Sequence, residues 1–170
     1  MTVGADVEYR WHADDVPGEL RVRQVYGWLL DQHGRCLVQV HADGVTNLPG
    51  GTPEPEDADQ VATLVREAME ENQVAVGETA YLGYQEVRRP RAEPYAQVRM
   101  VGLITAFHPR RPDPDGGDLY ARYMAPLAEA ARMLAWGDSG EAQAAAVLRV
   151  ATTRWGLPVH APLAAPGFMD

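Results

Sequence analysis

Three glutamates within one short stretch carry the strongest chemical signal in this sequence. Glu67, Glu70 and Glu71 follow Arg66 in the run Arg-Glu-Ala-Met-Glu-Glu. An α-helix advances about 100° per residue, so these carboxylates fall within roughly one third of its circumference. Three such charges repel each other, whereas Mg²⁺ prefers oxygen ligands and often binds carboxylates together with substrate phosphates. The spacing therefore predicts a Mg²⁺ site, with Mn²⁺ as the alternative ion.

The neighbouring residues fit the same chemistry. Arg66 stands four residues before Glu70 on the same helix edge, so its guanidinium is expected to orient that carboxylate. Upstream, Gly50 and Gly51 let the backbone approach a ligand closely, and a main-chain carbonyl there is a possible further ligand. A metal held in this way polarises phosphate oxygens and lowers the pKa of an attacking water. The constellation favours displacement at phosphorus.

A simpler interpretation exists for the same residues. An acidic helix face is commonly just a solvated face, and an Arg66–Glu70 pair can be an ordinary helical ion pair worth a few tenths of a kcal/mol. The Gly-Gly loop at a suitable distance before the carboxylates favours the functional interpretation.

Residues 51–74 resemble the Nudix box, in which a glycine leads through a spaced glutamate to Arg-Glu-hydrophobic-x-Glu-Glu-x-Gly-hydrophobic. The resemblance implies an α/β protein, with the Nudix-like α/β/α sandwich around a mixed central sheet. It also implies that Glu67 and Glu71 are the principal metal ligands, with Glu70 as an additional ligand or a carboxylate oriented by arginine. The Gly51 carbonyl is a possible further ligand, and the general base is Glu67 or Glu70.

The sequence departs from this box at three points. Fourteen residues separate Gly51 from Arg66, one more than in the family pattern. The position of the first glutamate is taken by Asp57, or by Glu56 if the extra residue lies later. The terminal glycine is replaced by Gln73, so we expect the helix to end by another geometry. The Arg-Glu-x-x-Glu-Glu core is intact.

Hydrophobic periodicity indicates the elements that position these residues. From 57 to 71 the spacing of Val61, Leu64, Val65 and Ala68 predicts an amphipathic helix whose apolar stripe lies opposite the carboxylates. A strand hairpin is predicted over 25–30 and 35–40, with further strands over 80–87 and 96–107. Proline-rich loops follow at 88–95 and 108–118, and helices at 126–134 and 140–155.

The chain divides into three parts on this pattern. Residues 1–22 are expected to form an N-terminal arm, irregular and loosely attached over residues 1–20. Residues 23–160 form one Nudix-like domain, and residues 161–170 a C-terminal tail. The single cysteine, Cys36, has no internal disulfide partner and is expected to be buried.

Overall charge limits the class of partner. The 170 residues carry a formal net charge of −9 and no lysine, which disfavours general nucleic-acid binding and association with an anionic membrane. A small phosphorylated substrate stays compatible, because a bound cation reverses the local field. No secretory signal or membrane-length apolar run is visible, so we expect a cytoplasmic protein. A homodimer formed by exchange of the N-terminal arm is possible.

Arginines outside the box are candidates for binding substrate phosphates, although in a chain without lysine they also serve as routine surface cations. These candidates are Arg88, Arg89, Arg91 and Arg99, followed by Arg110 and Arg111. Glu86 and Glu93 are candidates for an additional carboxylate. Tyr84, Tyr95, Tyr120 and Trp136 are candidates for stacking on a base, or for the core.

The sequence thus predicts a Mg²⁺-dependent hydrolase that cleaves a diphosphate bond in a nucleoside diphosphate linked to another group. Two alternatives stay open at this point. One is a Nudix-fold domain that binds a nucleotide or regulates without cleaving it, which the altered spacer and the missing box glycine favour. The other is an acidic interaction domain in which the carboxylate cluster is incidental.

Overall fold

The central strand β2 (Arg21–Leu30) needs cover on both of its faces, because its side chains alternate between two apolar environments. Val25 and Leu29 belong to one hydrophobic cluster, and Trp28 and Leu30 to the other. All four side chains are fully buried. The sheet that contains β2 is therefore the middle layer of the molecule.

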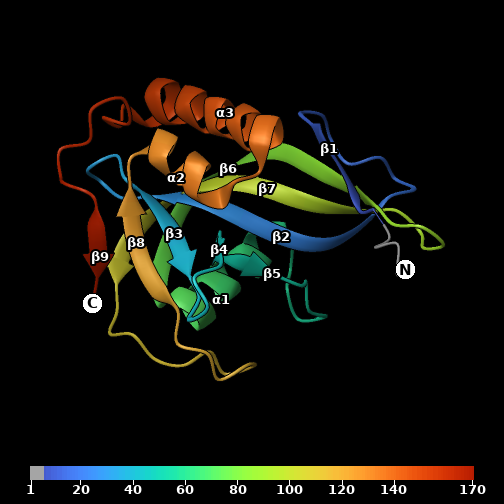
Figure 1. Cartoon of the computed structure of the whole chain (residues 1–170), viewed down its shortest axis with the longest axis horizontal. Coiled ribbons are helices and arrows are strands. Elements are labelled where there is room, and N and C mark those ends of the chain that lie inside the picture. Colours follow the sequence, from blue (N-terminus) through green and yellow to red (C-terminus); the bar gives the residue numbers. More distant parts are fainter. Residues whose placement is uncertain (1–5) are drawn as a thin grey trace.

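Helices supply this cover on both faces in the computed structural model, which describes residues 6–170 (Figure 1). Helix α1 (Gln60–Asn72) packs on the Val25 face through Leu64 and Ala68. Helices α2 (Leu127–Leu134) and α3 (Gly137–Trp155) cover the Trp28 face. The α/β/α sandwich expected from the sequence is confirmed.

The sheet is mixed, with strand order β1-β6-β7-β2-β3-β8-β9. Strands β2 and β7 run parallel, and the other neighbours run antiparallel. Two short strands lie off this path: β4 pairs with β3, and β5 pairs with β2. The bounds of the remaining strands are β1 Glu8–His12, β3 Cys36–Val40, β4 Thr46–Asn47, β5 Gly50–Gly51, β6 Val74–Arg88, β7 Tyr95–Phe107, β8 Ala121–Ala125 and β9 Gly167–Met169.

Most expected elements are present with shifted boundaries. The β2–β3 hairpin turns over residues 31–35, where Asp31 accepts hydrogen bonds from the backbone of His33 and Arg35. The strand expected over 80–87 begins earlier, because residues 74–79 continue into it as one bulged strand along β7. Cys36 is buried, as expected. Within residues 6–170 no helix has both the length and the hydropathy to cross a membrane.

The prediction of an irregular arm over residues 1–20 is wrong for residues 8–12. Residues 8–12 form β1, which pairs in antiparallel register with residues 84–88 of β6. Residues 1–5 lie outside the described part of the chain. At the other end, residues 167–169 of the expected tail form β9 against β8. Both segments contain too little apolar alternation to predict a strand without the neighbouring edge to which each one pairs.

Helix α1 starts three residues later than expected, because acidic side chains organise the turn before it. The Asp59 carboxylate accepts a hydrogen bond from the Ala62 backbone amide at 2.8 Å and caps the helix. Asp57 remains in the preceding loop, where it accepts hydrogen bonds from the Glu54 amide and the Thr63 hydroxyl.

The helix ends in the left-handed conformation for which glycine is usually chosen, although the residue there is Gln73 with φ 51° and ψ 44°. The expectation of another geometry is therefore wrong. The side chain of Gln73 is buried and compensates for the strain, since Nε2 donates to the Glu70 carbonyl at 2.8 Å. Its Oε1 accepts from the Arg111 amide at 3.1 Å, which ties the helix to the loop 108–118.

Gln73→Ala is expected to lower the free energy of unfolding by about 2 kcal/mol, because the strained backbone stays and two part-buried hydrogen bonds are lost. Urea unfolding at pH 7 measures this change. Gln32→Ala is the matched control: Gln32 is exposed in the β2–β3 turn, and its loss should change stability by less than about 0.5 kcal/mol. Equal effects of the two substitutions would contradict the role assigned to Gln73.

Candidate functional site

Two of the three glutamates on α1 are buried, contrary to the expected position opposite the apolar stripe. Glu67 and Glu71 are 9% and 8% exposed and share the inward face of the helix with Leu64 and Ala68. Val65, which was expected on the apolar stripe, is instead 36% exposed. Carboxylates are rarely buried without a charge partner or a ligand, so their position points to a site.

Glu71 lies against the glycine loop. Its Oε1 accepts a hydrogen bond from the Gly50 backbone amide at 3.0 Å, and its Oε2 accepts one from Gln39 Nε2 at 2.8 Å. No arginine or histidine forms an ion pair with it in the described part of the chain. Desolvation raises the pKa of Glu71 to about 7, and the two hydrogen bonds oppose this rise. The carboxylate therefore has room for a cationic partner.

Glu67 faces the second glycine of the loop. A Cβ atom at Gly51 would come within 2.3 Å of Glu67 Oε1, so a side chain at this position cannot coexist with the carboxylate as placed. Burial raises the pKa of Glu67, and the Arg66 guanidinium opposes that rise. The glycine loop and two carboxylates of α1 thus meet in one place, which the sequence spacing predicts.

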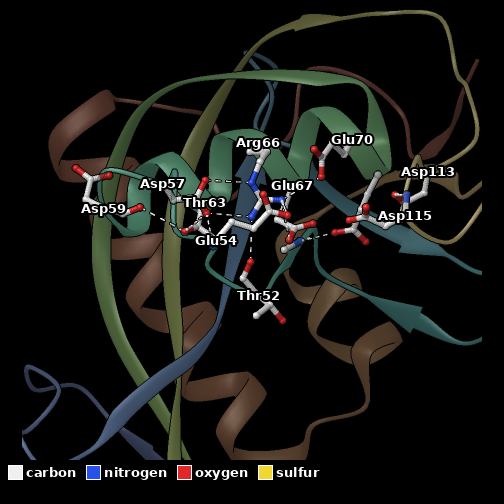
Figure 2. Close-up of polar contacts among 12 residues, drawn as sticks. Thr52, Glu54, Asp57, Asp59, Thr63, Arg66, Glu67, Glu70, Asp113 and Asp115 are labelled. Carbon is white, nitrogen blue, oxygen red and sulfur yellow. Dashed lines mark hydrogen bonds and ion pairs between the residues drawn. The ribbon is translucent and has the colours of Figure 1, made fainter.

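Arg66 is bound by several acceptors at once (Figure 2). Its Nη1 lies 3.0 Å from Glu70 Oε2, so the expected i,i+4 contact is present. Its Nε and Nη2 each donate to Asp57 at 3.0 Å. These hydrogen bonds hold the pKa of Asp57 well below its usual range. Asp57, one of the two residues predicted for the first glutamate position of the box, thus holds the arginine that contacts Glu70.

Arg66 also connects the helix to the loop before it. Its Nη2 donates to the Thr52 carbonyl at 2.9 Å, and its Nη1 lies 3.2 Å from Glu67 Oε1. The extra residue of the spacer is therefore accommodated without separating this loop from the helix.

Two further polar residues near the site were not identified from the sequence. Gln39, on β3, binds Glu71 and also donates to the Asn72 side chain at 3.0 Å. Asp113, in the loop 108–118, contributes to the raised pKa values of both Glu67 and Glu71 through its negative charge. In Figure 2, Asp113 and Asp115 appear at the same end of the view as Glu70. The loop was recognisable from its prolines, but its path back to the helix depends on the Gln73–Arg111 contact.

The donor set suits a hard divalent cation. All the candidate ligands are oxygens, and Gly51 leaves the space beside Glu67 that a side chain would fill. Among residues 6–170, no group of three or more aspartate, glutamate, histidine or cysteine side chains is placed so that it could hold a metal ion by itself. Arg66 Nη1 lies between Glu67 and Glu70 instead. The residues fit Mg²⁺ or Mn²⁺, with Glu67 and Glu71 as the principal candidates.

The four arginines predicted to bind substrate lie in different environments. Arg99 is buried and lines a cavity of about 600 Å³. Arg89 lines a separate cavity of about 600 Å³, beside Thr52, together with Arg21 and Arg23, which the sequence analysis did not single out. Arg88 is exposed and pairs with Glu86. Arg91 is exposed in the loop after β6. Only the environments of Arg99 and Arg89 favour a substrate contact.

The secondary candidates are mostly engaged elsewhere. Glu86 pairs with His12 of β1 at 3.2 Å, and Glu93 is exposed. Arg110 donates to the Tyr120 carbonyl, and the Arg111 amide binds Gln73. The aromatic rings have these neighbours: Tyr84 stacks on His12, Tyr120 lies beside His41, Tyr95 lies beside Arg23 and Arg89, and Trp136 lies over Arg99.

Solved structures of similar fold agree with this architecture. A NUDIX hydrolase from Nitrosomonas europaea matches with a TM-score of 0.57 and 18% identity, over 78% of this chain and 90% of that one. An ADP-ribose pyrophosphatase from Streptococcus suis matches with a TM-score of 0.51 and 17% identity, over 77% and 92%. The Bacillus subtilis pyrophosphohydrolase BsRppH matches with a TM-score of 0.51 and 22% identity, over 59% of this chain and 62% of that one.

Comparison of the sequence with protein-family models identifies the family to which this chain belongs. Curated protein sequences give no match to this chain. The family model described as NUDIX domain matches residues 20–153, which is more than half of the chain and includes the glycine loop, α1 and the sheet. The chain therefore belongs to the NUDIX domain family.

Proposed function

We propose that this Nudix protein is a hydrolase that uses Mg²⁺, or Mn²⁺, to cleave a diphosphate bond in a nucleoside diphosphate linked to another group. The observation that carries the proposal is the meeting of the buried Glu67 and Glu71 with the Gly50–Gly51 loop, where Glu71 accepts from the Gly50 amide and the Glu67 carboxylate fills the space beside Gly51. A fold alone does not imply an activity, so the argument depends on this site.

The residues of the site have separable tasks in this reaction. Glu67 and Glu71 would hold the cation, with the Gly51 carbonyl as a further oxygen. A bound divalent cation supplies polarisation of the phosphate oxygens and a water of lowered pKa. Arg66 orients Glu70 through its 3.0 Å contact. Either Glu67 or Glu70 would accept the proton of the attacking water, and Arg89 beside Thr52 would stabilise charge on the phosphate oxygens.

The family and a cavity lined by Arg99 support a class of substrate for this proposal. The Streptococcus suis protein of similar fold is named an ADP-ribose pyrophosphatase. The cavity that Arg99 lines also contains Tyr26 and Trp136, which offer aromatic faces to a planar group. Both features support a small nucleotide-like substrate.

The test is a hydrolysis assay on nucleotide sugars, ADP-ribose, dinucleotides and nucleoside triphosphates, with Mg²⁺ or Mn²⁺ and with EDTA as control. Mass spectrometry of the products identifies the cleaved bond. We expect metal-dependent release of two monophosphate products from a diphosphate-linked compound. Absence of turnover on the whole panel, with a folded protein, would contradict the proposal.

A domain that binds a nucleotide without cleaving it is the second candidate. Two observations favour it: the spacer has one extra residue, and Arg66 Nη1 lies between Glu67 and Glu70. Such a domain would bind the ligand tightly without metal and release it intact, so the same mass spectrometry separates the two candidates.

A further inference from the structure

Arg99 is a buried cation at the wall of a cavity. It comes from β7, is 4% exposed, and lines a space of about 600 Å³ between the sheet and the α2–α3 junction. Its guanidinium lies 4.8 Å from the ring centre of Tyr26 and 5.0 Å from that of Trp136. The two aromatic rings hold the cation in a fixed place.

The charge of Arg99 has no carboxylate partner within the described residues. Its hydrogen bonds are long: 3.5 Å to the carbonyls of Gln97 and Val98, and 3.2 Å to Gln97 Oε1. Its buried Nε has no hydrogen-bond partner. Burial lowers the pKa of Arg99 to about 10, so the side chain remains protonated at neutral pH. A buried and incompletely bonded cation costs stability in the free protein.

Other buried arginines of this chain are better bonded than Arg99, although Nη2 of Arg122 also lacks a hydrogen-bond partner. Arg35 lies 2.8 Å from the Asp31 carboxylate. Arg122 donates to the carbonyls of Asn72, His108 and Met169. Arg99 has neither an acid nor a comparable set of short carbonyl contacts.

The rest of the cavity is also poor in negative charge. The side chains that line it are neutral apart from Arg99. Gln85 accepts hydrogen bonds from Ser139 and Gln143 through Oε1, which leaves its Nε2 available as a donor. A group that enters this space therefore meets a cation, donors and aromatic faces, and an anionic oxygen group fits that combination best.

The cavity adjoins the carboxylate site through β2. Tyr26 pairs with Gly50 across the β2–β5 ladder, and the Gly50 amide binds Glu71. The charges of Arg99 and Glu71 both affect the pKa of Tyr26: burial raises this pKa, Arg99 lowers it, and Glu71 raises it. A chain of contacts thus links Glu71 to Arg99 through Gly50 and Tyr26.

We propose that Arg99 selects substrates that carry an additional oxyanion, a phosphate or a carboxylate, on the part of the molecule away from the cleaved diphosphate. This inference rests on the proposed function for the place of the diphosphate. The substrate class is then a nucleoside diphosphate derivative with a second anionic group, held between Tyr26 and Trp136.

Equilibrium binding to the full-length protein tests the selectivity separately from turnover. Ca²⁺ replaces Mg²⁺, so that the diphosphate keeps a divalent partner beside Glu67 and Glu71, and mass spectrometry checks that the ligand stays intact. Two ligand pairs differ by one anionic group: ADP-ribose with ADP-ribose 2′-phosphate, and UDP-glucose with UDP-glucuronic acid. The phosphate pair and the carboxylate pair show which source of oxyanion is recognised. We expect the charged member of at least one pair to bind about tenfold more tightly, as expected for a hydrogen-bonded charge pair.

Variants assign the preference to Arg99. Arg99→Met should bring the two members of the pair to within about twofold, and Arg99→Lys should keep part of the preference. Arg154→Met, at an exposed arginine that pairs with Glu78, is the control and should behave as the unmodified protein. The melting temperature of Arg99→Met without ligand should be unchanged or higher, because a buried unpaired charge is removed.

Equal affinities within both pairs, a preference that persists in Arg99→Met, or no binding of any ligand at millimolar concentration would each overturn this inference. Metal-dependent hydrolysis of ADP-ribose and UDP-glucose, the members without the additional oxyanion, is measured separately. Turnover without charge selectivity would leave the proposed function standing while the role of Arg99 fails.

Discussion

Glu71→Gln is expected to lower metal-dependent hydrolysis by about a thousandfold, because the uncharged amide oxygen binds a divalent cation much more weakly than a carboxylate does. We expect millimolar Mg²⁺ to raise the melting temperature of the unmodified protein, and the same substitution should abolish this rise. Steady-state kinetics on whichever diphosphate substrate the panel identifies measures the first effect, and thermal unfolding with and without Mg²⁺ measures the second. Undiminished turnover would rule out the mechanism.

Without metal, Glu71→Gln should increase the free energy of unfolding, although it removes the activity that depends on metal. The folded-state pKa of Glu71 is raised from 4.5 to about 7. Between these values the folded state binds more protons than the unfolded state, so the free energy of unfolding falls as pH rises through this window. The penalty at pH 8 is at most roughly 3 kcal/mol. Glu71→Gln avoids this penalty. Its side-chain amide has only one acceptor oxygen for the two donors, Gly50 and Gln39, so one hydrogen bond is lost. We therefore expect the free energy of unfolding at pH 8 to rise by about 1 kcal/mol.

Urea unfolding in EDTA at pH 5 and pH 8 measures this gain. The stabilisation by Glu71→Gln should be present at pH 8 and largely absent at pH 5, where the glutamate of the unmodified protein is already protonated. A variant that is less stable than the unmodified protein at pH 8 would show that Glu71 acts mainly as a structural acceptor for the glycine loop.

Arg66→Gln is expected to lower the free energy of unfolding at pH 7 by about 2 kcal/mol, since Asp57 and Glu70 lose their common cation. Asp57 is 7% exposed at the side chain and receives two of the arginine's hydrogen bonds. Arg154→Gln is the matched control: its ion pair with Glu78 is about half exposed, so its removal should cost less than about 1 kcal/mol. Urea unfolding measures both variants.

The effect of Arg66→Gln should depend on pH with a defined sign. Arg66 lowers the pKa of Asp57, so the stability that this pair contributes is present above the usual aspartate range and is lost as pH falls below it. The difference in the free energy of unfolding between the unmodified protein and Arg66→Gln should therefore become smaller below about pH 4. A constant difference from pH 7 to pH 3 would show that Arg66 acts through packing alone.

Sequence periodicity predicts the layers of this fold well, because alternation on β2 and the spacing of Leu64 and Ala68 are local properties of the chain. It fails where an element forms only against a distant neighbour. Residues 8–12 pair with β6 more than seventy positions later, and residues 167–169 pair with β8. Neither segment has a pattern that would predict a strand by itself.

The site shows the same division between local and distant information. The Arg-Glu-x-x-Glu-Glu spacing and the glycine loop are contiguous, so their meeting could be predicted. The burial of Glu67 and Glu71 could not, because it depends on the rotation of α1 over the sheet. Asp113 and Gln39 reach the site through tertiary contacts, and the isolation of Arg99 from acids is visible only when its neighbours are known.

Strand β1 determines whether a second copy of this protein could pair with the edge of β6. Residues 8–12 occupy the hydrogen-bonding edge of β6, an edge that would otherwise be open to another chain. Association there therefore requires β1 to detach first. A detached β1 donated by a second molecule would form the same five pairs, and reciprocal exchange would give a strand-swapped dimer. Such a dimer would form slowly and persist on dilution, since separation again requires both edges to be uncovered.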